Sequence, residues 1–179
     1  MNQRERIIEM EFSFDRKVVT PERGLKDLAL EGQGAKVIFA TDEFFGAKEN
    51  LIRTEPPIQK DSGLDAWVTK RRRGQGHDFS IIKLRRVSVI KEIIIDTSFM
   101  DGMTPSFISV DIQKREDVSL SEEHWTELLP MKPLSSNRSF LFRLNNNDLA
   151  SFVRLNVYPD GGIARLRLIG EEKLDEILF

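Results

Sequence analysis

The chain has 179 residues, of which 40% are hydrophobic and 31% are charged, and this is the size and composition of one ordinary globular domain. A formal net charge of −2 argues against a general affinity for nucleic acid or for an anionic membrane surface. The absence of cysteine excludes disulfides, thiolate metal ligands and a cysteine nucleophile.

The N-terminal sequence MNQRERIIEMEF lacks the continuous apolar core of a signal peptide. No apolar run in the chain approaches the roughly 20 residues that a membrane span needs. These two observations favour a cytoplasmic protein. Together with the net charge, they predict that it binds neither nucleic acid nor membrane.

The first elements are an edge strand and a helix. Residues 11–20 alternate in part, which predicts an edge strand, so residues 1–20 are an N-terminal extension or edge strand and residues 21–179 form a single domain. Thr20 and Pro21 resemble a helix N-cap followed by proline at the first helical position. This pattern predicts a short helix over residues 21–30 that Gly32 and Gly34 end.

The rest of the chain is a series of short apolar segments separated by turn residues. The predicted strands span residues 37–41, 67–73, 79–84, 87–97, 107–113, 125–129, 140–144, 152–158 and 163–169, with a closing edge element at 174–179. In residues 67–73, the side chains of Trp67, Thr69, Arg71 and Arg73 would share one face. The series predicts an all-β antiparallel sandwich, for which jelly-roll and immunoglobulin-like topologies both fit.

Residues 152–170, FVRLNVYPDGGIARLRLIG, predict a hairpin with its turn at residues 159–162. One face would be wholly apolar and belong in the core. The other face would place Asn156 opposite Arg165 and Arg154 opposite Arg167. Because opposed like charges destabilise a sheet, these arginines need partners. The partners are either the chain's own carboxylates or a bound anion, since guanidinium groups match carboxylates.

Six segments together resemble the allantoicase family, in the family's order and over residues 27–170. They are KVIFATDEFFGAKENLI, TEPPI, DAWVTKRRRGQGHDFSIIKL, VIKEIIIDTSF, HWTELLPMKPL and FVRLNVYPDGGIARLRLIG. The resemblance implies a jelly-roll sandwich of the galactose-binding-like type. It also implies a hydrolase that cleaves allantoate to ureidoglycolate and urea in purine degradation, the pathway of allantoin catabolism.

Three departures from the family pattern stand out. Allantoicases have two such repeats and this chain has room for one, a difference that a homo-oligomer can repair because two identical repeats mimic a tandem pair. The pattern resembling DGWETRRR has Val68 in place of its glutamate, and the Thr-His pair before VRLN is Ser151-Phe152. The loss of ionisable groups favours an alternative, a catalytically inactive ligand-binding or assembly module.

Allantoate is a small carboxylate with two ureido groups on one carbon, so its cleavage needs proton transfer and a cationic anchor. The candidate catalytic residues are Asp42, Glu43, His77 and Asp78. The candidate substrate-binding residues are Lys48, Asn50, Arg71, Arg72, Arg154, Asn156 and Arg165. His77 can transfer protons near neutral pH; alternatively it is a turn residue and Asp78 caps the next strand. Lys48 and Asn50 can instead satisfy their own loop.

A metal site is weakly indicated, because His77 and His124 are the only histidines and share no ligand spacing. The sequence requires no cofactor, and a site built from carboxylates would suit a divalent cation such as Mn²⁺ or Ca²⁺ better than Zn²⁺. The aromatic residues Phe44, Phe45, Trp67 and Trp125 are predicted to lie in the core, with an aromatic binding platform as the alternative.

Overall fold

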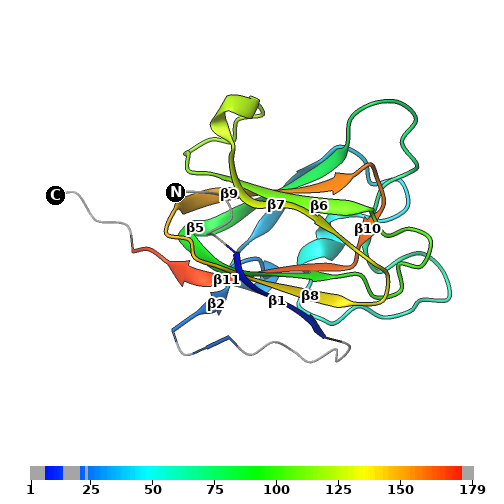
Figure 1. The fold of residues 1–179 in the computed structure, drawn as a ribbon, viewed down its shortest axis with the longest axis horizontal. Helices are drawn as coiled ribbons and strands as arrows, with labels where there is room; N and C mark the ends of the chain where they lie inside the picture. Colours follow the sequence, from blue (N-terminus) through cyan, green and yellow to red (C-terminus); the bar gives the residue numbers. More distant parts are fainter. Residues whose placement is uncertain (1–6, 14–20, 23, 175–179) are drawn as a thin grey trace.

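The computed structural model describes residues 7–13, 21–22 and 24–174, which form a jelly-roll sandwich of two antiparallel layers (Figure 1). One layer contains β3 (Lys36–Ala40), β9 (Leu149–Tyr158), β6 (Phe107–Gln113) and β7 (Thr126–Pro133). The other contains β1 (Ile7–Ser13), β8 (Ser139–Leu144), β11 (Arg165–Glu172) and β2 (Lys26–Asp27). The described residues also include a short pair, β4 (Trp67–Val68) with β10 (Gly162–Ile163), and the 3-10 helices η2 (Glu31–Gln33), η3 (Lys48–Ile52) and η4 (Glu122–His124).

The long strand β5 (Asp78–Asp96) belongs to both layers. Its first part, residues 78–83, pairs with β9, and part of it also pairs with β3. Its second part, residues 88–96, pairs with β11, and residues 92–96 also pair with β8. Two separate strands, 79–84 and 87–97, were predicted here. The prediction was wrong because the backbone continues through the charged residues 85 and 86 as it passes from one layer to the other.

The core lies between the layers, where the alternating apolar residues of each strand meet. Ile108, Val110 and Ile112 of β6 are at most 2% exposed, as the alternation predicted. The apolar positions of β9 and β11 join the same core cluster: Val153, Leu155, Val157, Leu166 and Leu168. Burial of these side chains is the main stabilising term of the fold, at about 25 cal/mol per Å² of apolar surface.

The helix predicted over residues 21–30 is absent and the prediction was wrong. Residues Lys26 and Asp27 form β2 instead, paired with Gly170 and Ile169 of β11. The carboxylate of Asp27 accepts hydrogen bonds from the backbone N–H groups of Ala29 and Leu168, at 3.0 and 3.3 Å. Strand pairing and this carboxylate satisfy the backbone groups that a helix would have satisfied, so tertiary context overrides the local helix signal.

Three predicted strands also differ from the structure in where they begin or end. The N-terminal edge strand is β1, paired with β8, and it begins earlier than residue 11; residues 14–20 lie outside the described residues. The strand predicted over residues 67–73 ends at Val68, and residues 69–77 form a loop. Leu174 lies in no strand, and the remainder of the closing element predicted at 174–179 lies outside the described part of the chain.

The hairpin predicted over residues 152–170 was wrong in its pairing. Strand β9 lies between β5 and β6, whereas β11 lies between β5 and β2 in the other layer. Arg154 is therefore opposite Asp111 and not opposite Arg167. The prediction assumed that consecutive strands pair with each other, whereas this chain changes layers between them. The apolar face of both strands does lie in the core, as predicted.

Arg165 anchors the long connection between β3 and β4. Its guanidinium donates to Oδ2 of Asp65 at 2.9 Å and to the carbonyl oxygens of Asn50 and Glu55, at 3.0 and 2.8 Å. Burial acts to raise the pKa of Asp65, but the hydrogen bonds from Arg165 and from the backbone N–H of Ile58, with the charges of Arg165 and Arg53, hold that pKa below its ordinary value. The buried carboxylate therefore stays ionised and fixes the loop.

No helix in the described residues is long and apolar enough to cross a membrane.

We expect Asp65→Asn to lower the free energy of unfolding by about 3 kcal/mol, because it leaves the buried charge of Arg165 unpaired. Urea denaturation followed by circular dichroism measures this. Since the pKa of Asp65 is lowered in the folded protein, its contribution is fully present above the ordinary value of 3.8 and is lost as the pH falls through the lowered value. The difference between variant and wild type should therefore shrink in strong acid.

The control is Lys26→Met, which breaks a pair with Glu172 in which the lysine side chain is 52% exposed. An exposed pair contributes at most about 1 kcal/mol. Equal losses in the two variants would contradict an anchoring role for the Arg165–Asp65 pair.

Candidate active site

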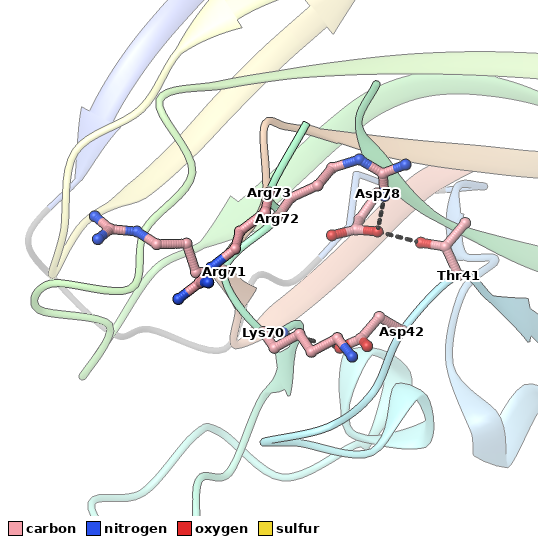
Figure 2. Close-up of a pocket in the computed structure, with 7 residues that line it drawn as sticks. All are labelled: Thr41, Asp42, Lys70, Arg71, Arg72, Arg73 and Asp78. Carbon is pink, nitrogen blue, oxygen red and sulfur yellow. Dashed lines mark hydrogen bonds and ion pairs between the residues drawn. The ribbon is translucent and has the colours of Figure 1, made fainter. Parts of the chain in front are cut away.

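A cavity of about 620 Å³ opens where β3 ends and β5 begins (Figure 2). Four consecutive basic residues of the loop that follows β4 form one side, and Thr41, Asp42 and Asp78 form the other. The basic residues, here called the basic loop, are Lys70, Arg71, Arg72 and Arg73. The sequence-predicted candidates Asp42, Arg71, Arg72 and Asp78 are thus brought together in one cavity.

Two aspartates hold the backbone of the basic loop. Oδ1 of Asp42 accepts hydrogen bonds from the backbone N–H groups of Lys70 and Phe44, at 2.9 and 3.1 Å. Oδ2 of Asp160 accepts the backbone N–H of Arg72 at 2.8 Å. Asp42 is therefore placed as a structural support of the cavity, and its carbonyl oxygen also accepts the indole N–H of Trp67 at 2.8 Å.

The carboxylate of Asp78 holds one arginine of the loop. Its Oδ1 accepts hydrogen bonds from Arg72 Nη1 at 3.0 Å and from the hydroxyl of Thr41 at 2.8 Å (Figure 2). The Asp78 side chain is buried, whereas that of Arg72 is 34% exposed, so the ion pair joins the cavity surface to the start of β5. Arg72 is thereby engaged, whereas Arg71 and Arg73 have no hydrogen-bond or ion-pair partner among the described residues and remain available to an anion.

A second group of polar residues covers the outer face of β9, beside the cavity. We call it the β9 polar cluster; its members are Ser109, Asp111, Glu122, Arg154, Asn156 and Tyr158. Register places it next to the cavity, because Asp78 is the partner of Val157 and Phe79 is the partner of Asn156. Four of its members, Ser109, Asp111, Arg154 and Asn156, are at most 9% exposed, which is unusual for polar residues on the outer face of a sheet.

Arg154 is the charged centre of the β9 polar cluster. It donates to Oδ2 of Asp111 at 2.7 and 3.0 Å and to both oxygens of Glu122 at 2.7 and 2.9 Å. Its hydrogen bond to Glu122 is the main cause that lowers the pKa of that carboxyl, against the opposing effect of burial. The guanidinium also lies 4.8 Å from the ring centre of Trp125. Of the two interpretations of the arginines, internal pairing with carboxylates describes Arg154, as it does Arg165.

His77 lies between the cavity and the β9 polar cluster. Its Nε2 is 3.0 Å from Oδ1 of Asn156, and its ring stacks on Tyr158 with centroids 4.4 Å apart. The ring is half-buried and directly precedes Asp78 in the chain. Burial raises the pKa of Tyr158, so its hydroxyl stays protonated. His77 is not one of the residues that line the cavity, but it directly precedes the lining residue Asp78 and is held by its own neighbours.

The remaining candidates lie in the loop around η3, outside the cavity lining. Lys48 pairs with Glu43 and Glu49, with nitrogen–oxygen distances of 3.3 and 2.8 Å. Nδ2 of Asn50 donates to the carbonyl oxygen of Ala66 at 3.0 Å. These contacts are the ones expected if the side chains satisfy their own loop.

The aromatic predictions were correct for Trp67, which is fully buried. They were wrong for Phe44 and Phe45, which are 70% and 54% exposed and contact each other edge to face. Both follow Asp42 in the turn that the carboxylate holds outside the core. Trp125 is half-buried and covers Arg154 rather than the core.

The two departures in sequence fall at buried positions. Val68 is 1% exposed and packs in a small apolar cluster with Ala66, Met100 and Ala164. Phe152 is 2% exposed and is the register partner of Lys83 and Gln113. Within the part of the chain that the structure describes, no group of three or more His, Cys, Asp or Glu side chains is arranged to hold a metal ion.

Sequence inspection missed Asp111, Glu122, Ser109 and Tyr158. The alternation of residues 107–113 carried a usable signal, because it places Ser109 and Asp111 on the face opposite the core. Glu122 had no such signal, since it reaches Arg154 from the separate helix η4.

The fold and the site together define a jelly-roll protein with a cavity lined by four basic residues. The allantoicase repeat model matches residues 26–173, and the chain belongs to the allantoicase family. It is 40% identical over 160 residues to a probable allantoicase of Rhizobium meliloti, with 85% of this chain and 47% of that protein aligned.

Solved structures agree on the fold. Allantoicase of Saccharomyces cerevisiae is 28% identical with a TM-score of 0.76, covering 90% of this chain and 55% of that one. The CBM32-3 domain from a family 31 glycoside hydrolase of Clostridium perfringens has a TM-score of 0.59 at 16% identity, covering 79% of this chain and 94% of that one, and shares the fold alone. The chain spans about half the length of the curated relatives that it matches.

We expect Asp78→Asn to speed tryptic cleavage of the basic loop several-fold, because Arg72 loses its charged partner and the loop opens more often. Limited proteolysis with mass spectrometry of the fragments measures the rate at Arg71 to Arg73. Asp61→Asn, a change of the same kind at an exposed residue, is the control. An unchanged cleavage rate in Asp78→Asn would show that the ion pair does not hold the loop.

Proposed function

We propose that this chain carries an allantoicase-type active site, which hydrolyses allantoate to ureidoglycolate and urea. The observation that carries the proposal is the cavity lined by the basic loop, inside the segment that matches the family. His77 directly precedes Asp78, which lines that cavity. A small anion with hydrogen-bonding ureido groups fits such a cavity, because guanidinium groups bind carboxylates through paired, charge-assisted hydrogen bonds.

Each residue of the site has a role in the proposed reaction that follows from its position. Arg71 and Arg73 bind the substrate carboxylate, since their guanidinium groups are unengaged among the described residues. Asp78 and Arg72 hold the loop in place through their ion pair. His77 takes a proton from the attacking water and returns it to the nitrogen of the leaving urea, so that hydroxyl is added to the carbon and no proton is lost overall.

The β9 polar cluster would support this centre rather than bind substrate through its arginine. Arg154 is fully engaged with Asp111 and Glu122, and Asn156 is 1% exposed. Arg165 is likewise engaged, because it donates a hydrogen bond to Asp65 and holds the loop that contains this residue. No metal enters the proposed chemistry of these residues, and a cytoplasmic location remains a prediction from the sequence.

We expect the wild-type chain to release urea and ureidoglycolate from allantoate, and Arg71→Ala to raise KM about tenfold or more. Removing a hydrogen bond to a charged group costs about 1.5–3 kcal/mol, which corresponds to at least a tenfold change. A coupled urea assay measures both constants, and Lys60→Ala, which removes one exposed positive charge elsewhere, is the control.

A folded wild-type protein without turnover would contradict the enzyme proposal. Calorimetric titration with allantoate then decides whether the chain is a binding module, which is the alternative that Val68 and Phe152 favour.

We also propose that the chain forms a homo-oligomer, in which a second copy takes the place of the second half of its longer relatives. Sedimentation velocity should give a mass at least twice that of the 20.6 kDa chain. A monomer at micromolar concentration would contradict this proposal without affecting the site, because the cavity is lined by residues of one chain.

A further inference from the structure

Asn156 occupies the middle of the β9 polar cluster, with Phe79 of β5 and Ser109 of β6 as its register partners. Its Nδ2 lies 2.8 Å from Oδ2 of Asp111 and 3.1 Å from the hydroxyl oxygen of Ser109. The same carboxylate oxygen accepts two hydrogen bonds from Arg154, so it acts as an acceptor. The amide atom that faces it must therefore be the donor nitrogen.

This orientation of the amide fixes the proton of His77. With Nδ2 directed at Asp111, the amide oxygen faces Nε2 of His77 at 3.0 Å. An amide oxygen only accepts hydrogen bonds, so Nε2 must carry a proton, and in the neutral ring Nδ1 is then unprotonated.

The face of the ring is also held. Tyr158 stacks on it at 4.4 Å, and the tyrosine hydroxyl is itself 2.9 Å from the hydroxyl of Ser109. Within the described residues, the contact with Asn156 is the one hydrogen bond that the imidazole makes. The imidazole is therefore fixed along one edge and one face, and Nδ1 has no hydrogen-bond partner among the residues that the structure describes.

We propose that Asp111 and Asn156 are positioning residues, which hold His77 in the Nε2–H tautomer so that Nδ1 is the nitrogen that accepts the proton during allantoate cleavage. The inference rests on the proposed function for its chemistry and on the hydrogen-bond directions for its geometry. Charged groups around the ring are Asp78 next in the chain, and Glu122, Asp111 and Arg154 from the cluster. None of these four has a hydrogen bond to the imidazole among the described contacts.

The tautomer is measured directly by long-range proton–nitrogen correlation NMR on the uniformly ¹⁵N-labelled protein, at a pH where the ring is neutral. His77 and His124 are the only two histidines, so a His124→Gln variant assigns the signals. We expect Nε2 of His77 to have the chemical shift of a protonated ring nitrogen and Nδ1 to have that of an unprotonated one. The opposite pattern, or the averaged shifts of a ring that exchanges between tautomers, would overturn the proposal without any variant at the site.

Two substitutions separate positioning from general stability. Asn156→Leu removes the hydrogen-bond acceptor of His77 Nε2 while keeping a similar side-chain volume, so both nitrogen shifts of His77 should move towards averaged values. The value of kcat should fall about tenfold or more, which is part of the 10²–10⁴ that a general base contributes. The value of KM should change less than about twofold. Ser109→Ala removes the other contact of the amide but leaves Asp111 in place. In this variant the tautomer of His77 should be the same as in the wild-type protein. Averaged nitrogen shifts of His77 in Ser109→Ala would overturn the role given to Asp111.

The measurement also distinguishes this inference from the proposed function. Turnover of allantoate by a protein whose His77 carries its proton on Nδ1 would overturn the positioning and leave the activity standing. The Nε2–H tautomer in a protein that does not turn over allantoate would overturn the proposed function, and with it the role of Nδ1 as a base.

Discussion

The fold depends on β5, a strand that both layers share. Its first part supplies the register for β3 and β9, and its second part supplies the register for β8 and β11. The shared backbone fixes how the layers lie relative to each other, so the core residues between them have little freedom to slide. It also fixes the site, because Asp78 begins this strand and His77 precedes it. Asp78 is paired with Val157 of β9, so the side chains at the start of the strand are held by the sheet.

Side-chain alternation predicted several of the strands and the face that they bury, because that face depends on a period of two along one segment. Residues 107–113 are the clearest case. Alternation failed for residues 67–73, where the strand ends at Val68. Pairing partners were not predictable in this way. The hairpin over residues 152–170 assumed that neighbours in sequence pair, and nothing local in the sequence records that the chain changes layers at Pro159 to Gly161. The helix at residues 21–30 failed for a related reason, since Lys26 and Asp27 pair with a strand more than 140 residues later.

The site was predicted in part. Asp42, Arg71, Arg72 and Asp78 were all expected to be functional, and they do line one cavity. Their division of labour was not visible, because only the folded chain shows that Arg72 is held by Asp78 while Arg71 is not. The partners of Arg154 were missed for the same reason: Asp111 and Glu122 come from distant segments. A sequence motif shows which residue types a site contains. The hydrogen bonds between those residues can be assigned only when the pairing of β5, β9 and β6 is known.

The basic loop has a consequence that reaches beyond direct contact. The chain as a whole has a formal net charge of −2, so most of its surface has no attraction for a small anion. Four adjacent cationic side chains at the mouth of a cavity reverse that sign locally, and a field of this kind draws an anion towards one place before any hydrogen bond forms. At physiological ionic strength such a field extends only about 8 Å. Capture of an anion would therefore be confined to the mouth of the cavity and would weaken steadily as salt is added.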